Sequence, residues 1–228
     1  MIPGSGFGLS LSGCYEARVS LLARKWHSIV GALDTAAFIG DLIVPATPTT
    51  IANWPEARGV STASHVTANI FNLGLTNGIR HLSNSTITTA RLEATGLGNT
   101  MEMWMVLKPT TLPASDYYCA CLAHDSASSR NRFGTITIGT STWYSPNTDV
   151  KRDGVNTADL ATGWHVYKRY FNFASASDQL SIGNDMDVPT QRTWQGDIAF
   201  IGCLSGPTSV QQTTDLFKEL MAYYKPIM

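Results

Sequence analysis

The chain contains 228 residues with a formal net charge of −1; only 14% of its residues are charged, whereas 43% are hydrophobic. This length suits one large β-sandwich and would make a second full domain cramped. The charge balance gives no electrostatic reason to expect nucleic acid or an anionic membrane as a partner, and no apolar run reaches the roughly 18 residues of a membrane span. A polar surface with few charges is more typical of virion, fibre or extracellular β-proteins than of cytosolic enzymes.

Residues 1–30 are predicted to form an arm and a short helix outside the domain at residues 31–228. The first residues are rich in glycine and serine, so this end is either disordered or an arm that orders against a neighbouring subunit. Residues 16–30 carry apolar side chains at helical spacing, including Val19, Leu22, Trp26 and Ile29. Because a β-sandwich buries its core without this segment, the helix either folds back on its own sandwich or packs against a copy of itself or another virion protein. We predict intermolecular contacts, in a homo-oligomer or a lattice, at Phe7, Leu9, Leu11, Val19, Leu22 and Trp26.

All four cysteines, Cys14, Cys119, Cys121 and Cys203, are expected to be reduced. Cys119 and Cys121 would lie on the same face of one strand, which is a poor geometry for a disulfide between them. The starting sequence M-I-P-G-S-G-F-G has neither the basic residues nor the apolar run of a signal peptide. Both features favour assembly in a cytoplasm.

From Leu33 onward the sequence has the alternation and the turn signals of a β domain. The stretch F-I-G-D-L-I-V at residues 38–44 predicts a first strand, which ends at Pro45. The dipeptide N-G at residues 77–78 predicts a hairpin turn, because both residues tolerate positive φ.

Residues 101–108, M-E-M-W-M-V-L-K, form the clearest predicted strand, with the methionines and Leu107 on one face. Residues 164–173 predict a second long strand, and K-R-D-G at residues 151–154 predicts a hairpin turn before it. We expect both long strands inside two antiparallel sheets packed face to face. Shorter strands are predicted at residues 86–93, 117–123, 132–139 and 142–144.

The end of the chain predicts a strand followed by one amphipathic helix. The strand begins near Trp194, and the dipeptide G-P at residues 206–207 ends it. Thr208 or Ser209 can cap the helix, which is predicted over residues 208–224. Its apolar face consists of Val210, Leu216, Phe217, Leu220 and Tyr224.

Three stretches of the sequence resemble motifs of concanavalin A-like, or laminin-G-like, jelly rolls of bacterial and bacteriophage proteins. They are W-P-E-A-R-G at residues 54–59, where the family has W-x-D-x-x-G, then G-W-H at residues 163–165, and W-Q-G-D-I-A at residues 194–199 before the terminal helix. The resemblance covers residues 33–228. It implies an all-β, concanavalin A-like jelly-roll sandwich of two antiparallel sheets, to which the N-terminal arm with its short helix and the C-terminal amphipathic helix are added.

No catalytic residue is predicted. Glucanases on this fold carry two carboxylates on one strand, in E-x-D-x-x-E or a close variant, one as nucleophile and one as acid/base. No such triplet occurs here, because Trp104 stands at the partner position of Glu102, and we expect Glu102 at an edge or rim. The motifs G-x-S-x-G, H-E-x-x-H, the P-loop and G-x-G-x-x-G are also absent from the sequence.

Two short clusters have the residue types of metal ligands. Cys119, Cys121 and His124 form C-x-C-x-x-H, but no fourth ligand lies nearby, and buried apolar cysteines are the favoured interpretation. The stretch G-N-D-M-D places oxygen atoms in a loop after a strand, and several laminin-G-like domains bind calcium in such a loop. Calcium is therefore a candidate cofactor, with a solvated turn as the favoured alternative, at Asn184, Asp185 and Asp187.

Aromatic side chains stack on pyranose rings, so the six tryptophans and eight tyrosines suggest a carbohydrate site. Trp143 and Tyr144 lie in a polar, loop-like stretch and are the candidates for ligand contact. For Trp143, packing against a loop or another subunit is the favoured interpretation. Trp104, Trp164 and Trp194 have strand positions and are expected in the core.

The sequence therefore predicts a non-enzymatic bacteriophage virion structural protein: a capsid decoration, fibre or tail-associated subunit. Its expected location is the virion, and its expected partners are other virion proteins and copies of itself, without nucleic acid or membrane. The alternative is a glycan-binding module that recognises host surface carbohydrate; a glycoside hydrolase is less favoured. Resemblance of fold cannot separate these, since this sandwich hosts lectins, enzymes and scaffolds.

Overall fold

The structure is a computed structural model that describes residues 28–67, 70–85, 89–110, 119–124, 130–133, 149–157, 159–170, 178–184 and 193–228. Residues 28–32 are helical. The elements that follow are β1 (Ala36–Ile39), η1 (Gly40–Leu42), β2 (Val44–Thr47), β3 (Thr50–Pro55), β4 (Thr62–His65), β5 (Asn72–Thr76), β6 (Ile79–Asn84), β7 (Leu92–Ala94), β8 (Glu102–Pro109), β9 (Cys121–His124), β10 (Arg130–Phe133), β11 (Val150–Arg152), β12 (Val155–Asn156), β13 (His165–Tyr170), β14 (Gln179–Ile182), β15 (Gly196–Leu204) and α2 (Val210–Tyr224).

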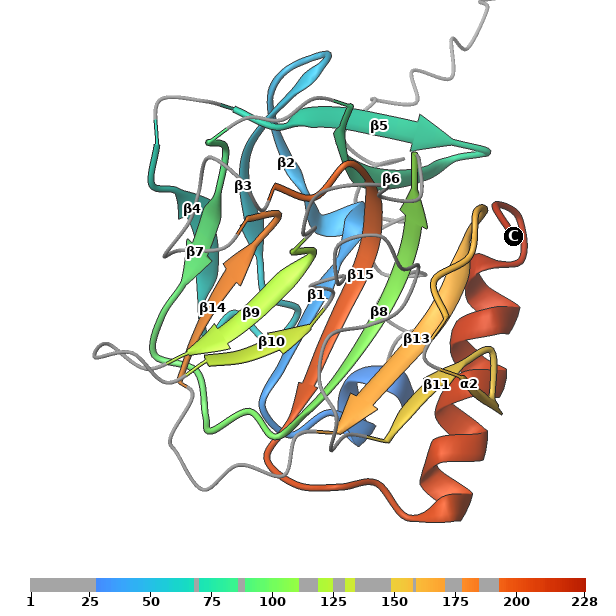
Figure 1. Ribbon diagram of the computed structural model, residues 1–228. Helices are drawn as coiled ribbons and strands as arrows, with labels where there is room; N and C mark the ends of the chain where they lie inside the picture. Colours follow the sequence, from blue (N-terminus) through green and yellow to red (C-terminus); the bar gives the residue numbers. More distant parts are fainter. Residues whose placement is uncertain are drawn as a thin grey trace, which may run out of the picture.

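These strands form one hydrogen-bonded, 15-stranded sheet (Figure 1). Its main path runs β10-β9-β14-β7-β4-β3-β5-β6-β15-β8-β13-β11-β12, while β1 joins β15 and β2 joins β3. All the pairings between these strands are antiparallel. The prediction of an all-β chain with a C-terminal helix is therefore confirmed for the described residues.

The strand β15 lies inside the sheet, between β6 and β8 on the main path. Its C-terminal half is flanked by β1 and β8, whereas its first residues are flanked by β6 and β8. A bulge between Ile198 and Phe200 marks the change of neighbour. Every residue of β15 except Asp197 is buried. A largely apolar run of this kind is what a strand covered on both faces requires.

Two apolar cores lie on opposite faces of β8 and β15. The alternation predicted for β8 is confirmed, because Met103, Met105 and Leu107 belong to the first core and Trp104 and Val106 to the second. The first core also contains buried residues of β3, β4, β7, β9 and β14, which lie in the other half of the strand path. The sheet therefore curves so that its two halves contribute to one core.

The second core is covered by α2, which runs beside β13 and β11 (Figure 1). Phe217 of the helix meets Trp104 of β8 edge-on, with 4.7 Å between the ring centroids. Tyr224 is fully buried at the end of the helix, and its hydroxyl donates to the carbonyl of Ala199 at 3.0 Å. These contacts fix the middle and the C-terminal end of the helix on the sheet.

A capping box starts α2 at Ser209. The Ser209 hydroxyl accepts the backbone N–H of Gln212, and the Gln212 side chain accepts the N–H of Ser209. The predicted apolar face is buried at Leu216, Phe217, Leu220 and Tyr224. The prediction was wrong for Val210, which is 87% exposed, because the first helical turn lies over polar groups rather than over an apolar strand.

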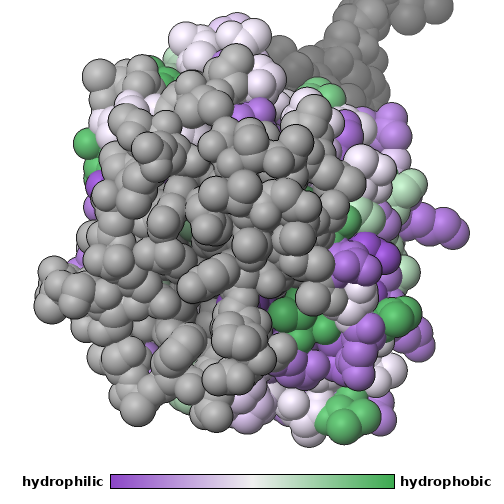
Figure 2. Space-filling view, in the orientation of Figure 1, coloured by the Kyte–Doolittle hydropathy of each residue, from purple (hydrophilic) through white to green (hydrophobic). Residues whose placement is uncertain are grey.

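The predicted strand at residues 38–44 is divided. β1 ends at Ile39, and η1 turns the chain before β2 begins. Gly40 approaches β6 so closely that a Cβ there would lie 1.9 Å from the carbonyl oxygen of Arg80. The turn at Asn77 and Gly78 is confirmed, with φ values of 46° and 84°. In the part of the surface that Figure 2 colours, hydrophobic residues are scattered singly among hydrophilic ones.

Candidate functional site

Most of the site residues predicted from sequence lie outside the described residues: Trp143, Tyr144, Asp185, Asp187, Phe7, Leu9, Leu11, Val19, Leu22 and Trp26. Asn184 is described, and it is fully buried in the turn that follows β14. Within the described residues, no group of three His, Cys, Asp or Glu side chains is arranged to hold a metal ion. The calcium loop therefore remains a prediction.

The predicted C-x-C-x-x-H cluster does not form one site. Cys119, Cys121 and Cys203 are buried thiols outside any disulfide, and burial raises the pKa of the Cys203 thiol to about 12. Cys121 belongs to the first core. His124 stands three positions later on the same strand and therefore on its other face, where its Nε2 lies 3.2 Å from the Ser181 hydroxyl.

On the face of β9 that carries His124, a row of polar side chains crosses β7, β14 and β9. This polar ladder consists of Glu93, Ser181 and His124. The Ser181 hydroxyl lies 3.3 Å from Oε1 of Glu93 and 3.2 Å from Nε2 of His124. Arg91 pairs with the same Glu93 oxygen at 3.0 Å. In a hydrolytic triad the carboxylate contacts the imidazole and not the hydroxyl. Here the Glu93 carboxylate and the His124 imidazole both contact the Ser181 hydroxyl, so the ladder does not have the order of contacts found in a triad.

A second polar chain joins Thr76, His81 and Asp197. The Thr76 hydroxyl lies 3.0 Å from Nε2 of His81, and Nδ1 of His81 lies 3.5 Å from Oδ1 of Asp197. This order is that of a nucleophile, a base and an acid, but the imidazole–carboxylate distance is that of an ion pair rather than of a hydrogen bond. His81 is buried and packs edge-on against Trp164.

Asp197 is held by more than His81. Lys108 lies 3.6 Å from its other oxygen. Burial alone would raise the pKa of Asp197, but its polar contacts with His81 and Ser83, together with the charges of His81 and Lys108, hold that pKa below its usual value. A carboxylate fixed in this way ties β6, β8 and β15 together, which is a structural function.

The stretch W-P-E-A-R-G at residues 54–59 also has a structural function. Glu56 is buried, and its Oε1 accepts the backbone N–H of Ala37 and the Arg58 Nε, each at 3.0 Å. Its Oε2 accepts the backbone N–H groups of Arg58 at 2.8 Å and Val60 at 3.3 Å. The indole N–H of Trp54 donates to the carbonyl of Ile39 at 2.8 Å. The motif thus attaches the end of β3 to β1.

Glu102 was expected at an edge or rim, and this expectation was wrong, because its exposed fraction is 0%. Its Oε1 accepts the indole N–H of Trp104 at 2.7 Å and the hydroxyl of Thr208 at 2.8 Å. Its Oε2 accepts the backbone N–H of Thr208 at 3.1 Å and pairs with Lys168 Nζ at 3.2 Å. Four donors compensate the carboxylate for the water that it loses on burial.

A cavity of about 490 Å³, the polar cavity, opens between the Glu102–Lys168 ion pair, the β11–β12 hairpin and the first turns of α2. Lys168 lies at its base, only 3% exposed, and pairs with Asp149 Oδ2 at 3.0 Å as well as with Glu102. Two lysines, Lys168 and Lys151, and two aspartates, Asp149 and Asp153, line this cavity, and the buried Glu102 adds a third carboxylate behind Lys168.

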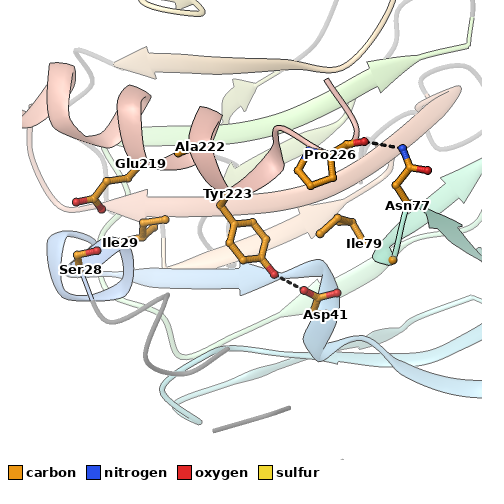
Figure 3. Close-up of a pocket in the computed structure, with 10 residues that line it drawn as sticks. Ser28, Ile29, Asp41, Asn77, Ile79, Glu219, Ala222, Tyr223 and Pro226 are labelled. Carbon is orange, nitrogen blue, oxygen red and sulfur yellow. Dashed lines mark hydrogen bonds between the residues drawn. The ribbon is translucent and has the colours of Figure 1, made fainter. Parts of the chain in front are cut away.

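A second hollow of about 530 Å³, the terminal groove, lies beside the C-terminal half of α2. In Figure 3, Tyr223 reaches from α2 across the groove, and its hydroxyl donates to Asp41. The Asn77 side-chain amide donates to the carbonyl of Pro226 at 2.6 Å and closes the far end. Ser28 and Ile29 line the end at which the described chain begins.

The sequence did not predict the buried ion pair between Glu102 and Lys168, because the two residues come from separate strands. Lys168 stands opposite Trp104 in the β13–β8 register, and this pairing is not visible in the sequence. One local signal existed: Glu102 shares a strand face with Trp104, whose indole N–H needs an acceptor when buried.

Comparisons with protein-family models, with curated proteins and with solved structures find no match for this chain. Among the described residues, no helix combines the length and apolar character that crossing a bilayer requires.

Proposed function

We propose that this chain is a non-enzymatic structural protein of a bacteriophage virion, built on a concanavalin A-like jelly roll. The proposal takes its virion assignment from the resemblance of residues 54–59, 163–165 and 194–199 to the phage and bacterial jelly rolls and from the low content of charged residues. As a capsid decoration, fibre or tail-associated subunit, it acts by binding copies of itself and other virion proteins.

The finer fold in this proposal is a sandwich of two sheets. It is supported by the first core, to which strands of both halves of the path contribute. A single curved sheet whose halves enclose such a core approaches the geometry of two packed sheets. The break between the layers would fall near β3, β5 and β6, where β3 and β5 share a single paired position.

The observation that favours a structural role over an enzymatic one is the state of the buried carboxylates. Glu56 and Glu102 each accept four hydrogen bonds or ion-pair contacts from the fold itself. A glycosidase needs two carboxylates that face the substrate, one as general acid and the other as nucleophile or as the base that activates water. Carboxylates that hold strands and the helix connection in place are occupied in the resting fold.

Antibody labelling of purified particles of the phage or prophage that encodes this chain tests the proposal. Gold label at one repeated position on the particle is the expected result in electron microscopy. A purified chain that cleaves a polysaccharide, or particles that carry no label although the chain is expressed, would reject the proposal. Denatured particles spotted on a membrane serve as the control for antibody recognition.

A further inference from the structure

We propose that residues 16–27 dock in the terminal groove of the same molecule and anchor the N-terminal arm beside α2. The first reason is the position of Ile29. The sequence places Val19, Leu22, Trp26 and Ile29 on one predicted helix face. Ile29 is 2% exposed, and it lies in the second core of its own domain. A helix that continues before Ser28 keeps the rest of this face on the same side.

The second reason is where the described chain begins. Ser28 and Ile29 line one end of the terminal groove, and Asn77 and Pro226 line the other (Figure 3). Residue 27 therefore adjoins the groove through one peptide bond. A tethered segment has a local concentration in the millimolar range or above, which favours it over a segment from another copy unless a linker prevents the contact.

The third reason is chemical complementarity. Ile79 and Ala222 give the groove apolar lining, and Asp41 and Glu219 add carboxylates. The segment before Ser28 carries apolar Leu22 and Trp26 together with a basic stretch at Arg24 and Lys25. Large apolar side chains can cover the apolar lining while the basic side chains reach the carboxylates, which is the arrangement of an amphipathic helix in a groove.

This inference deepens the proposed function, on which the role of the arm rests. With residues 16–27 held on their own domain, residues 1–15 leave the molecule from a fixed point beside α2. The intermolecular contacts then belong to Phe7, Leu9 and Leu11, whereas Val19, Leu22 and Trp26 contribute to the attachment of the arm.

Disulfide trapping tests the docking. In full-length protein with Cys14→Ser, the pair Ala23→Cys and Ala222→Cys, which keeps Leu22 and Trp26, should form an intramolecular disulfide under mild oxidation, detected by peptide mass spectrometry in a band of monomer size. The control pairs Ala23→Cys with Gln211→Cys, at the other end of the same helix, and should not cross-link. A cross-linked dimer would place the segment of a second copy in the groove, and no cross-link would leave the groove without this occupant; either result overturns the proposal.

A measurement on the unmodified protein guards against a misfolded variant. Trypsin should cut after Arg24 and Lys25 at least about tenfold more slowly in the full chain than in a synthetic peptide of residues 14–30, because a docked segment resists the protease. Equal rates would contradict the docking. Neither result depends on whether virions contain the chain, so failure of the docking and failure of the structural role are distinguishable.

Discussion

Glu102 and Thr208 lie 106 residues apart in the sequence, and two hydrogen bonds join them: the Thr208 backbone N–H and hydroxyl both donate to the Glu102 carboxylate, at 3.1 and 2.8 Å. Thr208 immediately precedes Ser209, the residue that caps α2. The start of the terminal helix is therefore fixed to the first residue of β8. Lys168 on the neighbouring strand completes the arrangement through its ion pair with the same carboxylate.

Replacement of Glu102 by alanine should lower the free energy of unfolding by about 3–5 kcal/mol, because it leaves Lys168 buried without its innermost partner. Chemical denaturation followed by circular dichroism measures the change. Asp215→Ala, on the exposed side of α2, is the matched control and should stay within about 0.5 kcal/mol of the parent. A Glu102 variant as stable as the parent would show that the carboxylate does not hold the helix.

Leu220→Ala should destabilise the protein by about 2–5 kcal/mol, because it removes a fully buried side chain between α2 and the sheet and leaves a cavity. The control lies on the same helix: Val210→Ala changes an exposed side chain and should have little effect. Thermal unfolding of both variants distinguishes packing from helix propensity. Equal losses in the two variants would contradict the docked position of α2.

Acid should destabilise the fold through Asp197. Its pKa is lowered in the folded state, so it contributes stability above the unfolded-state pKa, and this contribution disappears as the pH falls through the folded-state value. Asp197→Asn should be less stable than the parent near neutral pH, and the difference should shrink as the pH falls through the ordinary aspartate pKa of 3.8 and below it. Denaturation midpoints across that range check the prediction, with exposed Asp215→Asn as control. A constant difference would contradict it.

The arm can be tested without disturbing the domain. Because Ile29 is buried in the second core, a deletion that preserves the fold must stop before it. Removal of residues 1–15 should leave the circular dichroism spectrum and the unfolding midpoint unchanged but reduce assembly, which light scattering of the purified protein measures. A truncated chain that assembles as the full chain does would exclude the arm from the contacts.

Local patterns predicted the long strand β8 and the terminal helix well, and the polar interior poorly. The alternation of β8 and the stripe from Leu216 to Tyr224 follow from the periods of strand and helix, which a sequence displays directly. The burial of Glu102 depends on which strand pairs with β8 and on where the connection to α2 passes. Both depend on contacts between residues far apart in the sequence, and the hydrophobic period of a single segment does not predict such contacts.

The predicted strand at residues 38–44 is divided at Gly40 for the same reason, a contact between residues far apart in the sequence. Residues 38–44 read as one apolar strand, but Gly40 meets the backbone of Arg80, and the backbone N–H of Arg80 donates to Asp41 at 3.3 Å. A contact with a strand 39 residues away in the sequence therefore ends β1. The metal and carbohydrate predictions at Asp185, Asp187, Trp143 and Tyr144 lie outside the described residues and stay predictions.

Quantitative mass spectrometry of purified particles tests the virion assignment most directly. If the chain is a structural subunit, its peptides should persist through density-gradient purification at a constant ratio to the major capsid protein, with a copy number that fits a symmetric arrangement. The same preparation treated with protease before disruption gives the control for chains that merely adhere. Absence of the chain from the particles, or a ratio that falls with each purification step, would contradict a structural role in the virion.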